Sequence, residues 1–202
     1  NQDEYDINML VLPGIQNNIH GGVVEKAINV AEERGDCFVV ADPVSYNTSI
    51  ANVVTEAEKY DSNYAAMYWP WIQIPDNKIG KNVWVPPSTV LPGVIAFNDK
   101  VAHPWFAPAG LNRGGIDTAV QAERKLTQAD RDSLYDSNVN PIATFPGQGV
   151  TVFGQKTLQK KSSALDRINV RRLLIRVKKF VASSSRFLVF EQNTAATRRR
   201  FL

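Results

Sequence analysis

Short apolar runs alternate with periodic segments through the first third of the chain. Three apolar runs occupy residues 7–12, 37–41 and 64–69, and the first is closed by Pro13 and Gly14. In the two segments between these runs, apolar residues recur every three or four positions, which predicts amphipathic helices. Strands that alternate with helices in this way predict a Rossmann-like α/β domain, with three layers around a mostly parallel sheet.

The periodic segments also predict which side chains face this sheet. The first helix is expected to be capped by Asn17 or Asn18 and to end at Gly35, and the second to run from about Thr48 to Tyr60. The side chains expected to face inward are Val23, Val24, Ala27, Ile28 and Ala31 in the first helix and Ile50, Val53, Val54 and Ala57 in the second.

Three tryptophans lie within 16 residues at and beyond the end of the third apolar run. Apolar residues alternate on both sides of the polar turn at residues 76–81, which predicts a hairpin or two edge strands. A helix is expected from Ser88 to about Asn98. The tryptophans could form a ligand platform, but closing one end of the sheet core is the favoured role.

A tract at residues 103–116 separates the two halves of the chain. It contains too many Pro and Gly residues for a helix or central strand and too many apolar residues for a free linker, so we expect a pinned connection. The chain is accordingly divided into the Rossmann-like domain at residues 1–115 and a smaller α+β domain at residues 116–202. Trp105 and Arg113 are expected between the domains, where Arg113 would bind backbone carbonyls or an acidic side chain.

The second half is predicted to mix helices and strands. A polar helix is expected over residues 126–136. Residues 139–144 and 150–153 flank a Phe-Pro-Gly-Gln-Gly turn and are expected to pair as strands. A further strand is expected at residues 187–190, followed by a final helix.

The longest helix of the second half is expected to be capped by Asp166 and to run to about Ala182. Its apolar stripe is predicted to face the core and its basic face to be exposed. The stripe consists of Val170, Leu173, Leu174, Val177 and Val181, and the basic face of Arg171, Arg172, Arg176, Lys178 and Lys179. Arg198, Arg199 and Arg200 add basic charge in the final helix.

These basic side chains have three possible roles. They could bind acidic groups on another protein subunit, which makes them a candidate assembly interface. They could instead follow the phosphates of a nucleic acid, but the aromatic residues that such surfaces usually expose are expected in the core here. They could also form a solvated helix face with ion pairs inside the chain.

The two halves of the chain carry net charges of opposite sign. Residues 1–101 contain 6 Lys and Arg against 13 Asp and Glu, a net charge of −7, whereas residues 102–202 contain 17 against 7, a net charge of +10. A molecule with one acidic and one basic lobe can attract copies of itself head to tail, in contacts that generate rings or helices. The charge pattern therefore favours self-assembly over catalysis; the alternative is a pair of solvated surfaces whose charges are unrelated.

Sequence signatures of catalysis and of bound cofactors are missing. The turn after the first strand has neither a G-x-G-x-x-G spacing nor a G-K-[ST] sequence. His20 and His103 are the only histidines and lie 83 positions apart, and Asp42 before Pro43 is typical of a turn. The single cysteine, Cys37, is expected to be a buried strand residue in a protein made in a reducing cytoplasm. We expect no catalytic residue, metal, cofactor or membrane insertion.

The two ends of the sequence favour a piece of a longer protein. The chain lacks an initiator Met, and the final helix, begun near Asn193 or Thr194, reaches Leu202 without a Gly or Pro stop. The second domain is therefore expected to be truncated at its end.

Several motifs follow one another in an order that resembles the contractile tail sheath proteins of myoviruses and R-type pyocins, and most closely those of T-even-like phages. Single motifs are short, but their order covers essentially the whole chain. The motifs are Val85-Pro86-Pro87-Ser88, Pro104-Trp105, Ala107-Pro108-Ala109-Gly110, Arg113-Gly114, Leu126-Thr127, Leu134-Tyr135, Asn138-Val139-Asn140-Pro141-Ile142, the segment from Phe145 to Leu158, Ile168-Asn169-Val170-Arg171-Arg172-Leu173 and Phe190-Glu191-Gln192-Asn193.

The resemblance implies a structural protein without cofactor or bond chemistry. Sheath proteins of this family assemble as six-fold rings stacked helically around a tail tube, and they contract to drive the tube through the host envelope. The implied partners are other sheath subunits, the tail tube protein, the baseplate and the tail terminator, in a virion assembled in the host cytoplasm. The alternative is an α/β protein that binds nucleic acid or a nucleotide.

Overall fold

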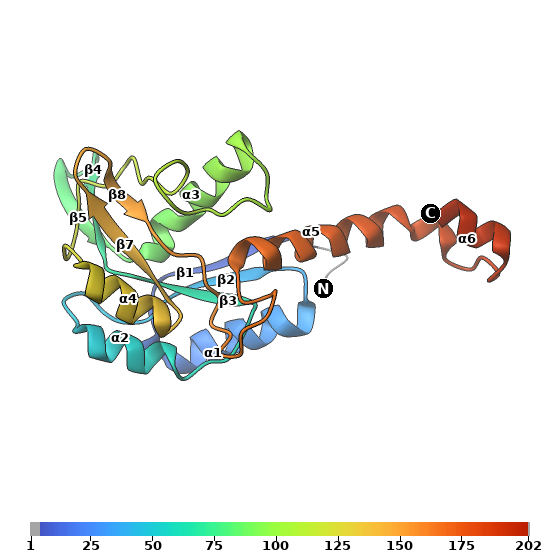
Figure 1. The fold of residues 1–202 in the computed structure, drawn as a ribbon, viewed down its shortest axis with the longest axis horizontal. Coiled ribbons are helices and arrows are strands. Elements are labelled where there is room, and N and C mark those ends of the chain that lie inside the picture. The colour runs from blue at the N-terminus through green and yellow to red at the C-terminus, as the bar shows by residue number, and fades with distance from the viewer. Residues whose placement is uncertain (1–4, 202) are drawn as a thin grey trace.

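A five-stranded sheet forms the centre of the protein, with strands in the order β1-β2-β3-β7-β8 (Figure 1). This computed structural model describes residues 5–201. Neighbouring strands from β1 to β7 are parallel, and β8 is antiparallel to β7. The predicted mixed α/β fold with a mostly parallel sheet is confirmed. The strands are β1 (Met9–Gln16), β2 (Phe38–Asp42), β3 (Ala65–Trp69), β7 (Val139–Phe145) and β8 (Gly149–Val152).

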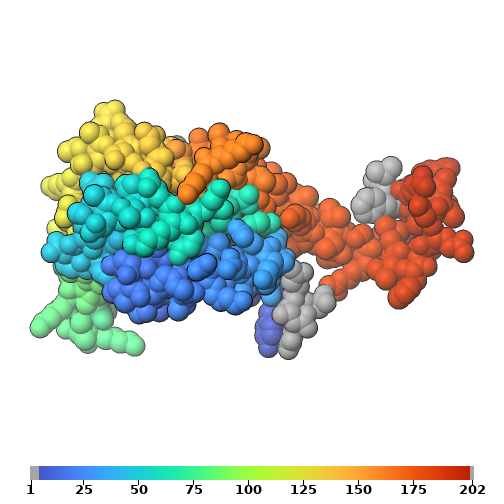
Figure 2. All heavy atoms as spheres, turned by 90° about the horizontal axis from the view of Figure 1, so that it is seen from below, coloured from blue at the N-terminus to red at the C-terminus, as the bar shows by residue number. Residues whose placement is uncertain are grey.

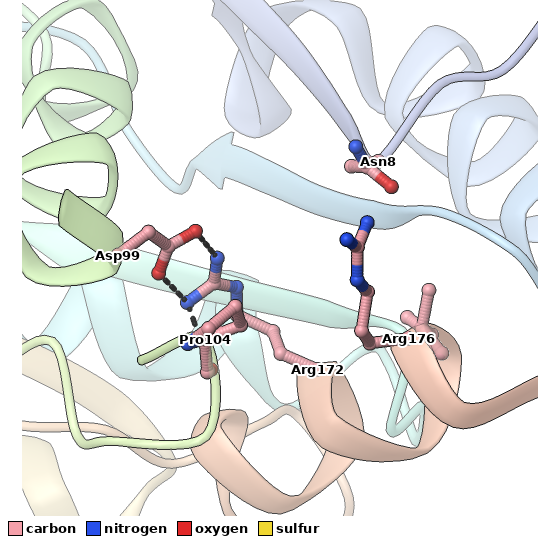
Figure 3. Close-up of a pocket in the computed structure, with 6 residues that line it drawn as sticks. Asn8, Asp99, Pro104, Arg172 and Arg176 are labelled. Carbon is pink, nitrogen blue, oxygen red and sulfur yellow. Dashed lines mark hydrogen bonds and ion pairs between the residues drawn. The ribbon is translucent and has the colours of Figure 1, made fainter. Parts of the chain in front are cut away.

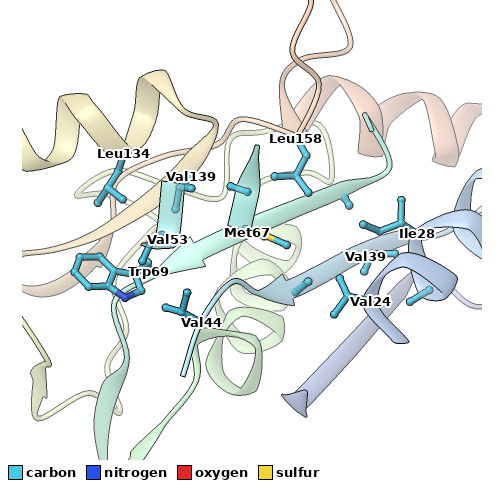
Figure 4. Close-up of a cluster of buried hydrophobic side chains, with 14 of the residues drawn as sticks. Val24, Ile28, Val39, Val44, Val53, Met67, Trp69, Leu134, Val139 and Leu158 are labelled. Carbon is cyan, nitrogen blue, oxygen red and sulfur yellow. The ribbon is translucent and has the colours of Figure 1, made fainter. Parts of the chain in front are cut away.

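Helices pack against both faces of this sheet. In the central strands, successive side chains point to opposite faces, so Val39 and Met67 contact one group of helices whereas Val40 and Tyr68 contact another. Figure 4 shows the first of these two cores. The helices that contribute to it are α1 (Asn17–Arg34), α2 (Ile50–Ala57) and α4 (Gln128–Asp136), and those on the other face are α3 (Pro87–Val101) and α5 (Ile168–Ser184).

Helix α1 matches its prediction except at its start and at Val23. It ends at Gly35, which adopts the left-handed φ of 66° that favours glycine at this position. Its N-cap is Gln16, and its first residue, Asn17, binds Glu56 and Tyr60 rather than capping the helix. Val23, predicted to face inward, is 49% exposed, whereas the other four predicted inward residues of α1 are buried.

A second, smaller sheet lies beside the first, with strands in the order β5-β4-β6. Strands β4 (Ile72–Asp76) and β5 (Lys81–Val85) form the predicted hairpin, and β6 (Gln121–Ala122) pairs with β4 although no strand was predicted there. Trp69 is fully buried, as expected for a residue that closes the core. Trp71 and Trp84 are half-buried and surround the ring of Tyr46.

The central sheet continues across the predicted domain boundary near residue 115. Strand β7 pairs with β3, so the second half of the chain completes the sheet that the first half begins. The tract at residues 103–116 is pinned to β8, as predicted. Its backbone hydrogen bonds join Gly110 and Gly114 to Val152, and Ile116 to Val150. The division into two folding units stays a prediction.

The last part of the chain forms an arm that extends from the body (Figures 1 and 2). Beyond α5, the chain forms a 3₁₀-helix, η1 (Arg186–Leu188), and then α6 (Ala195–Phe201). The prediction of a strand at residues 187–190 is therefore wrong. Phe187 and Phe190 are exposed, and an apolar run that contacts no neighbouring strand has nothing to hold it in a sheet.

Candidate assembly surface

Helix α5 is attached to the body of the protein by its basic side chains, beginning with Arg171. This arginine is only 4% exposed. Its guanidinium lies 4.1 Å from the centre of the Tyr64 ring and donates a hydrogen bond to the Asn63 side chain. A cation above an aromatic face is attracted by the electron density of the ring, and the attraction is strengthened where water is excluded.

Arg172 forms a bidentate ion pair with Asp99 at the end of α3 (Figure 3). Its Nη1 atom donates to Asp99 Oδ1 at 3.0 Å and to the Pro104 carbonyl at 3.2 Å, and its Nη2 atom donates to Asp99 Oδ2. A fork of this kind fixes both side chains. It ties α5 to α3 and to the start of the pinned tract.

Lys179 joins the outer part of α5 to the start of the described chain. Its Nζ atom donates to Asp6 Oδ1 at 2.6 Å, to the Ile7 carbonyl at 2.6 Å and to Asn8 Oδ1 at 2.8 Å. The hydrogen bond from Lys179 lowers the pKa of the Asp6 carboxyl. All three N–H donors of the Lys179 ammonium group are therefore bound to acceptors in the same chain.

The orientation of α5 is therefore opposite to the prediction. Ile168, Arg171 and Ile175 are its buried residues, and no side chain of the described chain caps it, since Arg167 rather than Asp166 is the N-cap. The predicted apolar stripe is only half-buried at Val170 and Leu173. The remaining stripe residues, together with Phe180, form an exposed surface that we call the outer face: Leu174, Val177, Phe180 and Val181.

The other predicted basic residues remain close to the surface. Arg176 is exposed, points toward Asn8 in Figure 3, and forms no hydrogen bond or ion pair within residues 5–201. Lys178 donates to the Tyr64 hydroxyl at 3.3 Å. In α6, Arg198, Arg199 and Arg200 are exposed; Arg198 binds the Asn193 side chain, and Arg200 lies over the Phe187 ring.

Trp105 and Arg113 both contact other parts of the pinned tract. Trp105 stacks on His103 with ring centres 4.5 Å apart, and its carbonyl accepts a hydrogen bond from Asn169 at the start of α5. Arg113 donates to the Ala107 carbonyl at 3.4 Å and lies over the Phe106 ring. A role for this pair between two domains stays a prediction.

Asp42 is buried and accepts two hydrogen bonds from the start of α3. Its Oδ1 atom accepts from the Ser88 backbone N–H at 2.9 Å, and its Oδ2 atom accepts from Ser88 Oγ at 2.5 Å. Burial raises the pKa of the Asp42 carboxyl to about 6, although the two hydrogen bonds from Ser88 oppose this shift. Within residues 5–201, no group of three or more His, Cys, Asp or Glu side chains is placed to hold a metal ion.

Replacing Asp42 with asparagine is expected to change how stability depends on pH. Because the folded-state pKa of about 6 exceeds that of an ordinary aspartate, Asp42 favours folding increasingly as the pH falls from 7 to 4. The D42N variant should lose this dependence. Relative to the natural chain, its free energy of unfolding should rise by about 2.5 kcal/mol between pH 4 and pH 8 in urea titrations. A difference that stays constant with pH would contradict the assignment.

The family model for the phage tail sheath protein central domain matches residues 1–158, which include the whole five-stranded sheet. The chain belongs to the phage tail sheath family. This confirms the resemblance inferred from the order of sequence motifs. The sheath family model ends before α5, so the arm formed by α5, η1 and α6 lies outside the matched residues.

Individual sheath proteins resemble this chain over most of its length. The tail sheath protein of Vibrio phage KVP40 is 39% identical over 150 residues, which cover 74% of this chain and 21% of that protein. The tail sheath protein of Enterobacteria phage T4 is 33% identical over 196 residues, covering 89% of this chain and 30% of that protein. A PVC sheath complex of an extracellular contractile injection system, solved in its contracted state, matches with a TM-score of 0.80 at 26% identity.

This chain spans only part of the length of each relative. It covers about a third or less of the two phage proteins, and 97% of this chain covers 52% of the PVC sheath chain. Among the described residues, no helix combines the length and the hydropathy that crossing a bilayer requires.

Proposed function

We propose that this chain is part of the structural subunit of a contractile phage tail sheath, which assembles helically around the tail tube and contracts to drive it through the host envelope. The match of residues 1–158 to the sheath central domain carries this proposal. The likeness to a PVC sheath complex in its contracted state supports contraction as the activity. Such a subunit works through contacts between copies, so it needs no catalytic group.

The proposed partners follow from the same function. They are other sheath subunits in stacked six-fold rings, the tail tube protein, the baseplate and the tail terminator, in a virion assembled in the host cytoplasm. A matching chain from the anti-feeding prophage belongs to a baseplate structure. Neither nucleic acid nor a membrane is a proposed partner, and the chain is proposed not to be an enzyme.

The basic residues of the arm have two proposed roles. Arg176, Lys178 and the arginines of α6 would meet acidic groups on a neighbouring subunit or on the tube, since their charges lie at the surface. The position of this surface would be fixed by Arg171, Arg172 and Lys179, because they hold α5 to the body.

The two-domain architecture is also a proposal. Helices on both faces of the central sheet support a Rossmann-like arrangement in three layers. A smaller α+β unit at residues 116–202 would then share this sheet through β7 and also contact the first unit at Trp105 and Arg113. The arm extends from the body in Figure 1, which supports a separate unit in the C-terminal part of the chain.

The proposed function is tested by electron microscopy of the full chain, meaning the complete sheath subunit of which these 202 residues are proposed to be part. We expect regular tubes, alone or around added tail tubes, and an R176E variant that folds normally but forms few of them. Exposed charges contribute little to folding, whereas each contact in a helical assembly is repeated many times. The matched control is K26E, which makes the same change at an exposed position of α1.

Three outcomes separate the alternatives. Normal tubes from R176E would remove Arg176 from the interface but keep the sheath function. No tubes from the natural full chain under any condition, together with salt-dependent binding of DNA or RNA, would favour a nucleic-acid surface instead. Loss of tubes in K26E as well would show a general effect of charge.

A further inference from the structure

The arm exposes a large amount of apolar surface. On α5 this surface is the outer face, Leu174, Val177, Phe180 and Val181, whose exposed fractions are 36%, 44%, 67% and 41%. It continues after the helix with further exposed apolar side chains, Phe187, Val189 and Phe190. Contiguous exposed apolar residues of this kind mark surfaces that another polypeptide covers.

The attachment of α5 leaves no way for the helix to bury this face against its own body. Arg171, Arg172 and Lys179 hold the opposite side of the helix to the sheet, α3 and the start of the chain. Rotating α5 to bury the outer face would break the Arg172–Asp99 ion pair and expose Ile168 and Ile175, which are now in the core. The outer face therefore stays exposed in the described part of the chain.

We propose that further polypeptide of the same chain, outside these 202 residues, covers the outer face. The phage relatives are about three to five times as long as the part that this chain matches, and the PVC sheath chain is about twice as long. Helix α6 turns back toward the body, so its C-terminal end lies closer to the body than its start does (Figure 1). A continuation of the chain beyond α6 would therefore start at the end of α6 that is nearer the body.

Tethering favours this occupant over a second copy of the chain. A segment joined by a short connection reaches the face at an effective concentration in the millimolar range, which a separate subunit does not reach in dilute solution. An exposed stripe of this size would otherwise promote aggregation of each monomer before assembly.

The rim of the outer face indicates the chemistry of the covering segment. Arg176 and Lys178 lie on opposite sides of the apolar stripe in the helical projection, and Arg186 follows at its far end. A hollow of about 610 Å³ lies between the end of α1 and α5, and it is lined by these three basic residues and also by Asp6 and Asp36. The segment should therefore place apolar side chains on Val177 and Val181, and acidic side chains beside the basic rim.

Cysteine labelling of the full chain tests this inference in the monomer. In a V177C variant, the introduced thiol should react with a maleimide at least about tenfold more slowly than the thiol of T55C, which lies on the exposed side of α2. The natural Cys37 is fully buried and supplies the unreactive background. Analytical ultracentrifugation establishes that the labelled sample is monomeric, and L174C provides a second position if V177C does not fold.

The outcomes distinguish the possible occupants. Protection of V177C in the monomer supports a covering segment of the same chain, and this result does not require that tubes form. Rapid labelling in the monomer with protection only in assembled particles would overturn the proposal in favour of a second copy. Rapid labelling in both states would show an uncovered face and would also overturn it.

Discussion

Replacing Gly114 with alanine is expected to destabilise the protein by about 3 kcal/mol or more. A Cβ atom at this position would lie 2.6 Å from the Val152 carbonyl oxygen and 2.8 Å from the backbone N and O of Gly110. All three are backbone atoms, and the Gly110 and Val152 groups are hydrogen-bonded to each other. The tract at residues 103–116 would therefore have to separate from β8 to make room.

The neighbouring glycine provides a matched control for this prediction. A Cβ atom at Gly115 would meet only Asp117 Oδ1, at an ordinary distance of 3.7 Å. Urea unfolding of G114A and G115A should therefore give clearly different free energies of unfolding. Equal stabilities would show that the tract is not fixed against β8 in the way described.

Replacing Asn140 with leucine is expected to cost about 3 kcal/mol or more of stability, because it leaves buried backbone groups without partners. Asn140 is fully buried in β7. Its Nδ2 atom donates to the Met67 and Lys156 carbonyls at 3.1 and 2.8 Å, and its Oδ1 atom accepts from the Lys156 N–H at 2.6 Å. One side chain thus joins β3, β7 and the segment that leads to α5.

The same substitution at an exposed asparagine controls for the change of residue type. Asn52 lies on the exposed side of α2, so N52L should change the free energy of unfolding by no more than about 0.5 kcal/mol. Guanidinium titrations of both variants measure the difference. If N140L unfolds at the same denaturant concentration as N52L, the hydrogen bonds of Asn140 do not hold these segments together.

The parallel core of the fold could be predicted because its strands are short apolar runs. All five residues of β2 and all five of β3 are buried, and this explains why apolar residues fill both segments without alternation, except at Asp42. A strand at residues 139–144 was expected, but its place beside β3 in the central sheet could not be predicted in the same way. Asn140 and Pro141 interrupt its apolar run, and its partner β3 lies about 70 residues earlier in the chain.

The orientation of α5 shows a second limit of sequence periodicity. The spacing of apolar and basic residues correctly grouped the side chains that share a face, but it did not establish which face is inside. That choice depends on distant partners, since Arg172 pairs with Asp99 and Arg171 with Asn63 and Tyr64. An arginine that is paired and hydrogen-bonded can be buried, whereas an apolar stripe is left outside when no partner is present.

The decisive measurement is a helical reconstruction by cryo-electron microscopy of tubes formed by the full-length protein. We expect a repeating subunit that contains the sheet in the order β1-β2-β3-β7-β8, with α5 bound to it through the Arg172–Asp99 ion pair. Particles without helical order, or density in which the basic side of α5 faces away from the sheet of its own subunit, would contradict it.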